Sequence, residues 1–316
     1  MRNIFLSVLL VVFTGQIIGQ NKAQITQKIL SYPETFNSTF SLVYRIKSDF
    51  STDLDRTYAV YSWITNNIAY DYAAANAYSG LWKPDVNGDP DPDHYKSIAN
   101  YTFQYRIAVC EGSSVLFNEL CRAMDIQVHK VVGCARTRVS EIGVPWNSNH
   151  AWNLVVLDDQ QFLVDSTWGA GAWKNNGFVK NPNDFYFMTP PELFIEKHYP
   201  EDTKYTLLNE NPSKSWFLEK AIPQTWNNTF VTANLPKSGI IEKPSQGVRE
   251  LKFDLNVAAP ITRVSILNNG EFIPVTNYVH ENGRLTFTHA ISSGYLKNQL
   301  LVYINNKAVL KYRVVE

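Results

Sequence analysis

The sequence has no excess of charge of either sign. Its 316 residues contain 29 Lys and Arg against 29 Asp and Glu, which gives a formal net charge of zero at neutral pH. Proteins that bind nucleic acid, or that rest on an anionic membrane, depend on clustered Lys and Arg. The composition therefore argues against nucleic acid as the main partner and against a polybasic contact with a lipid surface.

Internal repeats and low-complexity tracts are also lacking. The residues are 45% hydrophobic, 13% aromatic and 18% charged, which is the composition of a folded chain rather than a disordered one. At about 100–200 residues per domain, the length predicts two domains.

Long apolar runs are scarce. The one strongly apolar run extends from Ile4 to Phe13, follows the positive charge of Arg2 and precedes the small residue Gly19. It is shorter than the roughly 20 residues that span a bilayer. The pattern predicts a signal peptide over residues 1–19 and a secreted or periplasmic protein, with no integral membrane segment in the mature chain.

Cysteine is scarce as well, and the count is odd. The chain has only Cys110, Cys121 and Cys134, which cannot all pair within one molecule. Cys121 follows Cys110 by about three helical turns on an apolar face, and Cys134 alternates with Val132 along an expected strand. Both are predicted to be small buried hydrophobic residues, so the role of Cys110 needs another explanation.

Helices and strands are predicted around these cysteines. From Ser51, polar capping residues precede apolar residues at helical spacing as far as Ile68. A second helix is predicted from Glu111 to about Met124, and the glycine-containing stretch Trp168–Asn183 is predicted to be a loop. Three runs are predicted to be strands: Val128–Ala135, His150–Leu157 and Gln161–Asp165.

Beyond about Asn209 the pattern becomes that of an all-β module. Short alternating runs are separated by turn sequences such as Asn-Gly. The runs are Val248–Val257, Thr262–Leu267, Arg284–Thr288 and Leu300–Tyr303. We predict a sandwich-like C-terminal domain over residues 209–316, after a first domain over residues 20–208.

Cys110 stands at the start of the second predicted helix. The unpaired backbone N–H groups and the positive end of the helix dipole favour a thiolate at this position. The same N–H groups are able to hold an oxyanion. Cys110 is therefore the candidate nucleophile.

A nucleophilic cysteine needs a base, and His150 is the best placed of the six histidines, at the start of a predicted strand. If this strand and the next form a hairpin through a two-residue turn at Asp158-Asp159, His150 faces Thr167. Asp165 then lies on the same face as Thr167, as a diagonal neighbour of His150 within hydrogen-bonding reach. A three-residue turn would place His150 and Asp165 on opposite faces.

Cys110, His150 and Asp165 thus form a predicted catalytic triad. In this arrangement Asp165 fixes the imidazole tautomer, while His150 takes the thiol proton and returns it to the leaving group. Such chemistry needs no metal or other cofactor, and none is expected.

The segments around these residues resemble the three motifs of the transglutaminase-like superfamily, in the same order. Two upstream segments resemble the helix that precedes those motifs, especially in the kyphoscoliosis-peptidase-like branch. The resemblance covers about residues 45–205. The motif segments are Val109–Gly112, His150–Asn153 and Asp165–Gly169, and the upstream segments are Tyr61–Ile64 and Asn67–Asp71.

The resemblance implies an α+β fold with a papain-like core, in which the helix that carries the cysteine packs on an antiparallel sheet that bears the histidine and the aspartate. It also implies that Cys110 is the nucleophile, His150 the base and Asp165 the third member of the triad.

Further site residues follow from the same resemblance. Papain-like enzymes place a Gln shortly before the cysteine to help bind the oxyanion, and Gln104 stands six residues upstream. Mammalian transglutaminases use a Trp instead, for which Trp82 is the near candidate. Trp152 and Trp168 are expected to wall the cleft, with burial in the core as the alternative for each.

The acidic segment Asp85 to Asp93 places oxygen ligands at alternate positions, as calcium loops do. It lacks the Glu that closes an EF-hand loop, and two prolines stiffen it. A solvated loop is therefore favoured over a metal site.

Together these features predict a secreted, metal-independent cysteine enzyme acting on a protein or peptide substrate. Attack on a peptide or glutamine-type amide would give a thioester, which water or an amine then resolves. The sequence leaves hydrolysis and transamidation open, and resemblance to the peptidase-like branch favours hydrolysis. The alternative is a non-catalytic binding or scaffolding module for a protein or cell-wall partner, against which the intact triad argues.

Overall fold

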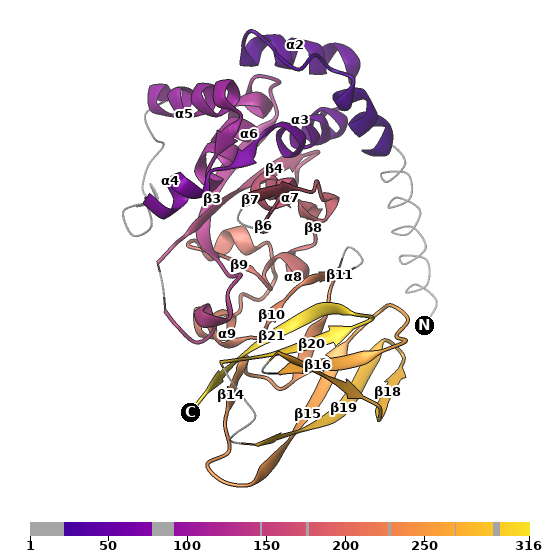
Figure 1. Ribbon diagram of the computed structural model, residues 1–316. Helices are drawn as coiled ribbons and strands as arrows, with labels where there is room; N and C mark the ends of the chain where they lie inside the picture. Colours follow the sequence, from indigo (N-terminus) through magenta and orange to yellow (C-terminus); the bar gives the residue numbers. More distant parts are fainter. Residues whose placement is uncertain are drawn as a thin grey trace. The chain divides into compact units, whose positions relative to one another are not determined.

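The computed structural model describes residues 22–77, 92–145, 147–174, 177–226, 229–268, 270–292 and 298–316. The chain divides into two compact units, each described by itself below (Figure 1). The first comprises the chain up to Val132 together with His150–Thr189, and the second comprises Gly133–Asn149 and Pro190–Glu316. The predicted domain boundary after residue 208 falls inside the second unit and stays a prediction. The predicted signal peptide, Trp82 and residues 85–91 of the acidic segment lie outside the described residues.

Helices make up the early part of the first unit, coloured indigo to magenta in Figure 1. After a helix over residues 22–30, they are α2 (Thr39–Asp49), α3 (Asp53–Asn67), α4 (Tyr72–Ala77), α5 (Pro92–Tyr105) and α6 (Cys110–Arg122), with the short α7 (Ser166–Ala170) later in the chain.

The first predicted helix is confirmed as α3. The side chain of Thr52 accepts a hydrogen bond from the Asp55 N–H, and Asp53 and Asp55 add negative charge to the first turn, where the helix dipole favours it. The apolar face is buried, with Trp63 only 2% exposed. This helix packs against both α6 and α7, so it supports the elements that carry two of the predicted site residues.

The second predicted helix is confirmed as α6, which begins at Cys110 itself with Val109 as its N-cap. Its first turn packs closely on its neighbours. A Cβ atom added at Gly112 would lie 2.6 Å from Thr102 Oγ1 and 2.8 Å from Ala108 Cβ. Only glycine therefore lets the first turn of α6 approach α5 and the residues just before Cys110 so closely.

We expect Gly112→Ala to lower the free energy of unfolding by about 1–3 kcal/mol, because the added methyl group overpacks this contact. The matched control is Gly177→Ala, since a Cβ at Gly177 meets nothing within 4 Å. Urea denaturation of both variants and the parent measures the difference. Equal stabilities of the two variants would contradict the packing argument.

The antiparallel sheet of the first unit has the strand order β8-β5-β4-β3. In the pair β4–β5, Asn153 faces Val164 and Leu157 faces Gln160, which confirms the predicted register. The turn residues Asp158 and Asp159 both have positive φ, 49° and 59°, as a two-residue hairpin turn requires. The strands are β3 (Gln127–Ala135), β4 (His150–Leu157), β5 (Gln160–Val164) and β8 (Phe187–Thr189).

The prediction of a loop over Trp168–Asn183 is wrong in part. The last turn of α7 leads directly into a small antiparallel hairpin of β6 (Gly171–Lys174) and β7 (Gly177–Lys180). Glycines suggested irregular backbone, but Gly171 has a φ of 150° and its missing Cβ lets the Val179 carbonyl approach closely. The glycine therefore permits the hairpin instead of preventing it.

The second unit consists mainly of strands and contains the predicted C-terminal β-region. Two sheets, with strand orders β10-β21-β20-β16-β17 and β13-β15-β19-β18, share one apolar core. Phe253 of one sheet meets Tyr312 of the other edge to face, with ring centroids 5.7 Å apart. The four predicted runs correspond to β15 (Val248–Asn256), β16 (Val264–Asn268), β19 (Arg284–Ser292) and β20 (Gln299–Ile304).

The unit has further elements, of which β11 and β12 form a separate two-stranded sheet and β9 pairs with residues Gly133–Ala135. The helices are α8 (Pro191–Phe194) and α9 (Lys214–Glu219). The strands are β9 (His198–Pro200), β10 (Ile222–Pro223), β11 (Thr225–Trp226), β12 (Thr229–Phe230), β13 (Thr232–Leu235), β14 (Ile240–Glu242), β17 (Glu271–Val275), β18 (Tyr278–Glu281) and β21 (Lys307–Val315). In the described part of the chain, no helix has the length and hydropathy that a membrane crossing requires.

Candidate active site

Cys110 is the first residue of α6 and is 6% exposed. The chain reaches it through β2 (Ile107–Ala108), which pairs in parallel with β1 (Ala69–Tyr70). The first N–H groups of a helix have no acceptor within the helix, so they stabilise negative charge near the start of the helix. The predicted position of Cys110 at a helix N-terminus is therefore present in the structure.

An ion pair beside the cysteine ties α6 to the sheet. Lys130 Nζ lies 2.7 Å from Glu111 Oε1, and the lysine side chain is only 6% exposed. Burial lowers the pKa of Lys130, but the charge and hydrogen bond of Glu111, together with those of Tyr95, outweigh it, so the pKa is raised. The pair holds the first turn of α6 against β3, and sequence reasoning had no signal that joined these two residues.

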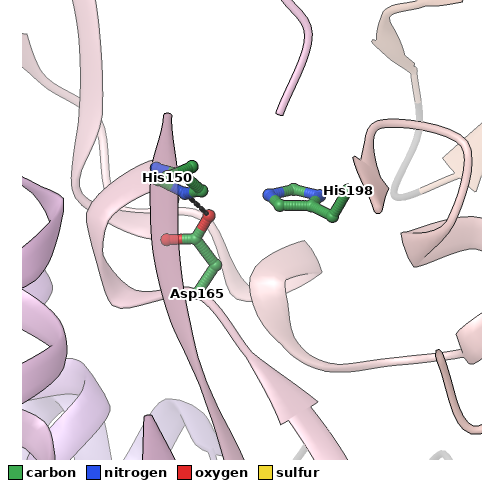
Figure 2. A group of neighbouring side chains, drawn as sticks. All are labelled: His150, Asp165 and His198. Atoms are coloured by element: carbon green, nitrogen blue, oxygen red, sulfur yellow. Dashed lines mark hydrogen bonds and ion pairs between the residues drawn. The ribbon is translucent and has the colours of Figure 1, made fainter. Parts of the chain in front are cut away.

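His150 and Asp165 lie together as predicted, and Figure 2 shows the hydrogen bond between them. The imidazole Nε2 of His150 lies 2.8 Å from Asp165 Oδ2, with the two residues 5% and 0% exposed. His198, also drawn in Figure 2, belongs to the second unit, where its ring stacks on Phe194 with centroids 4.0 Å apart.

The carboxylate of Asp165 has a second function as the N-cap of α7. Its Oδ1 accepts hydrogen bonds from the backbone N–H groups of Thr167 and Trp168, at 2.9 and 3.0 Å. The backbone N–H of Asp165 donates to the Tyr186 carbonyl at 2.9 Å. These bonds fix the carboxylate, so that only Oδ2 is directed at His150.

The Cys110 thiol also interacts with the His150 imidazole. Burial lowers the pKa of His150, but the charge and hydrogen bond of Asp165, and then the hydrogen bond and charge of Cys110, raise it to about 10. Since Nε2 is bound to Asp165, Nδ1 is the nitrogen left for the sulfur. The arrangement holds a protonated imidazole between the Asp165 carboxylate and the Cys110 sulfur near neutral pH.

The raised pKa of His150 predicts a pH-dependent stability. A folded pKa of about 10 against the ordinary histidine pKa of 6.5 means that the folded state holds the proton more tightly. The contribution is fully present below pH 6.5 and is lost as the pH rises through 10. We expect it to be on the order of a few kcal/mol.

The measurement is the free energy of unfolding by urea at intervals between pH 6 and pH 10.5, for the parent and for His150→Gln, which cannot titrate. The difference between the two proteins should shrink as the pH increases. A difference that stays constant over this range would show that His150 does not carry a raised pKa.

A buried polar network that sequence reasoning missed joins the cysteine helix to the histidine strand. Asn153 of β4 is 0% exposed and donates to the Ser114 carbonyl at 3.0 Å and to Asn118 Oδ1 at 2.7 Å. The Ser114 hydroxyl donates in return to the Trp152 carbonyl at 3.0 Å. The network sets the position of α6 relative to β4. Its signal in the sequence is an asparagine in an otherwise apolar buried strand.

The two predicted wall residues both lie beside His150. Its ring centroid is 6.0 Å from that of Trp152 and 5.3 Å from that of Trp168. Trp152 is 1% exposed, whereas Trp168 is partly exposed. Gln104 is exposed on the last turn of α5. Contact of the tryptophans with a substrate, and an oxyanion role for Gln104, stay predictions.

The remaining cysteines lie in apolar surroundings, as predicted. Cys121 and Cys134 are 0% and 1% exposed, and none of the three cysteines takes part in a disulfide within the described residues. Burial raises the pKa of the Cys121 thiol, and it raises that of Cys134 to about 11. Both thiols therefore stay protonated near neutral pH, and the protonated thiol is a poor nucleophile.

The sequence matches a family model described as the transglutaminase-like superfamily over residues 41–166, a stretch that contains all three predicted triad residues. The kyphoscoliosis peptidase of Homo sapiens is 33% identical over 171 residues, which is 53% of this chain and 24% of that protein. Hillarin of Drosophila melanogaster is 24% identical over 195 residues, which is 57% of this chain and 22% of that protein.

This chain thus spans about a quarter of the length of these curated relatives. Among solved structures, a crystal structure of a TGase is similar at 19% identity and a TM-score of 0.30, over 53% of this chain and 35% of that one.

Proposed function

Since residues 41–166 belong to the transglutaminase-like superfamily, with similarity to its kyphoscoliosis-peptidase branch, we propose that this chain is a cysteine enzyme that acts on peptide or glutamine-type amides. One observation carries the proposal: the buried His150 ring interacts with the Asp165 carboxylate at 2.8 Å and with the Cys110 thiol. These are the contacts that an activated thiol, its base and its orienting carboxylate require.

In the first half of the reaction, the Cys110 sulfur attacks the amide carbonyl carbon, and the carbonyl oxygen becomes an oxyanion at the N-terminus of α6. The proton held by His150 moves to the amide nitrogen, the C–N bond breaks, and the amine leaves. The product is a thioester between Cys110 and the acyl group.

In the second half, His150 takes a proton from water or from an incoming amine, which attacks the thioester carbonyl. The sulfur leaves as the thiolate, and His150 is again protonated. Water gives a carboxylic acid, and an amine gives a new amide. We propose hydrolysis as the main outcome, because the human and mouse relatives carry the name peptidase.

A screen of amide substrates tests the proposal, with wild type compared to Cys110→Ala. Peptide libraries report hydrolysis, and glutamine peptides offered with a labelled primary amine report transamidation. Intact-mass detection of an acyl adduct on Cys110 provides a readout that does not depend on product release. Identical profiles for the two proteins, with no adduct on wild type, would end the catalytic proposal in favour of a binding or scaffolding module.

Export of the protein is a separate part of the proposal, and it depends on the apolar run Ile4–Phe13. Expression of the full chain in a secreting host should give a mature N-terminus near residue 20 in the exported fraction. Retention of the uncleaved chain inside the cell would contradict it.

A further inference from the structure

Three aromatic rings of the first unit form a continuous series. The ring centroids of Tyr70 and Tyr72 are 4.8 Å apart, and those of Tyr72 and Trp173 are 4.1 Å apart. Tyr70 and Tyr72 are half-buried, while Trp173 is 44% exposed. The series therefore runs from two half-buried rings to an exposed one.

The inner end of the series is held next to Cys110. Tyr70 pairs with Ala108 in the parallel β1–β2 bridge, and the following Asp71 N–H donates to the Ala108 carbonyl at 2.9 Å. Ala108 precedes Cys110 by two residues. Burial raises the pKa of Tyr70, and the charge of Cys110 is the next contribution, so the phenol lies within the electrostatic field of the sulfur.

Trp173, the outer end of the series, lies in a hairpin that follows Asp165 and α7 in the chain. Trp173 lies in β6, which directly follows α7, the helix capped by Asp165. In the hairpin, Trp173 faces Phe178, and β7 lies beside β1. The Lys180 ammonium donates to the Asn66 carbonyl at the end of α3. The hairpin is thus joined to α7 through β6, and to β1 and α3 through β7.

The chemistry of this surface favours an apolar ligand group. The three rings offer apolar faces, and a large exposed tryptophan gains free energy when another apolar group covers it. The carboxylate between the tyrosines, that of Asp71, accepts the Ala74 N–H at 2.8 Å as the cap of α4. This hydrogen bond ties the segment that carries the two tyrosines to α4.

We propose that Tyr70, Tyr72 and Trp173 form a specificity subsite that binds an aromatic or large aliphatic side chain of the acyl donor, close to the amide that Cys110 attacks. The proposal rests on the proposed function, because it assigns the substrate class of the same site. Tyr70 and Tyr72 form the inner part of the subsite, and Trp173 covers the bound side chain from the surface.

The test uses alkylation of Cys110 in the full chain, which needs no turnover. The reagents are the chloromethyl ketones of N-acetylphenylalanine and N-acetylglycine, in each of which the sulfur displaces chloride to form a thioether. Rates are divided by the rates of the same reagents with glutathione. Iodoacetamide, which has no side chain, reports the reactivity of the thiol itself.

We expect the phenylalanine reagent to label wild type about tenfold faster than the glycine reagent, since a buried apolar group in a pocket is worth this much or more. Trp173→Ala should reduce the preference to about twofold, and Trp173→Phe should restore part of it. The iodoacetamide rate should stay the same in both variants. Tyr101→Ala is the matched control, because Tyr101 is 56% exposed and also contacts a second ring, that of Tyr105.

Two results would overturn the subsite and leave the proposed function standing. In the first, iodoacetamide labels Cys110 rapidly but the two ketones react equally. In the second, the preference for phenylalanine survives in Trp173→Ala. If no reagent labels Cys110 faster than Cys121, the proposed function fails together with the subsite.

Discussion

Replacement of Asp165 by Asn should lower kcat/KM for an amide substrate by about a thousandfold to ten-thousandfold while the fold stays intact. The two carboxylate oxygens of Asp165 have separate partners. Oδ1 accepts hydrogen bonds from the N–H groups of Thr167 and Trp168, and Oδ2 accepts one from the His150 Nε2–H. An asparagine can replace Oδ1 with its carbonyl oxygen, so the cap of α7 is retained.

The amide nitrogen of that asparagine then occupies the position of Oδ2 and donates a hydrogen bond to Nε2. The imidazole is forced to accept there and to carry its proton on Nδ1, the nitrogen that faces Cys110. In this tautomer the ring cannot take the proton of the thiol, and the positive charge loses its carboxylate partner. Activity is lost through the wrong tautomer and not through unfolding.

The measurement combines kcat/KM near neutral pH with the midpoint of thermal unfolding. Asp165→Ala is the comparison variant, because it removes the cap as well as the partner of His150. It should lose comparable activity and, in addition, about 0.5–2 kcal/mol of stability. An Asn variant that retains activity within a few-fold of wild type would remove Asp165 from the triad.

Selective alkylation of Cys110 is the second large effect that we expect. An ordinary thiol with a pKa of about 8.5 is less than about 1% ionised at pH 6, and the thiolate is the reactive form. A protonated His150 imidazole stabilises a thiolate at Cys110. The His150 pKa of about 10 keeps this imidazole protonated at pH 6. Iodoacetamide should therefore label Cys110 at pH 6, where Cys121 and Cys134 react slowly.

His150→Ala should reduce the labelling rate of Cys110 at pH 6 by about a hundredfold. The reduction should become small at pH 9, where an ordinary thiol ionises without help. His129→Ala is the matched control, since His129 lies in β3 of the same unit and its hydrogen-bonding partner is Gln127. Peptide mapping by mass spectrometry assigns each adduct to a cysteine.

Equal, slow labelling of all three cysteines in wild type would contradict an activated thiol. An unchanged pH profile in His150→Ala would show that the helix N-terminus alone, without the imidazole, sets the reactivity of Cys110.

The predicted hairpin shows why part of the site could be read from the sequence. A two-residue turn at Asp158-Asp159 sets the register of both strands, so one local assumption places His150 and Asp165 on the same face. The structure has this turn and this register. The position of Cys110 at a helix start is equally local, because capping residues and apolar spacing mark where a helix begins.

The contacts between distant segments could not be read in this way. The bonds from Asn153 to Ser114 and Asn118, and the ion pair of Glu111 with Lys130, join residues 19 to 39 positions apart. Pairing of this kind depends on how α6 packs on the sheet, and one sequence contains no register for that packing. The α7 helix was missed because a five-residue helix depends more on its cap and on tertiary contacts than on helix propensity. One such contact is that of Gly169 with Tyr61. The β6–β7 hairpin, which follows α7, was missed with it.

The sequence by itself determined which residues are candidates for the chemistry and which elements carry them, because turn length, capping and apolar periodicity are local properties of the chain. Tertiary packing alone decided how these elements meet. It directed one oxygen of Asp165 to the α7 cap and the other to His150, and it brought the rings of Tyr72 and Trp173 within 4.1 Å across about a hundred residues of chain. Such contacts form only when the burial of many side chains together offsets the entropy of ordering the segments between them.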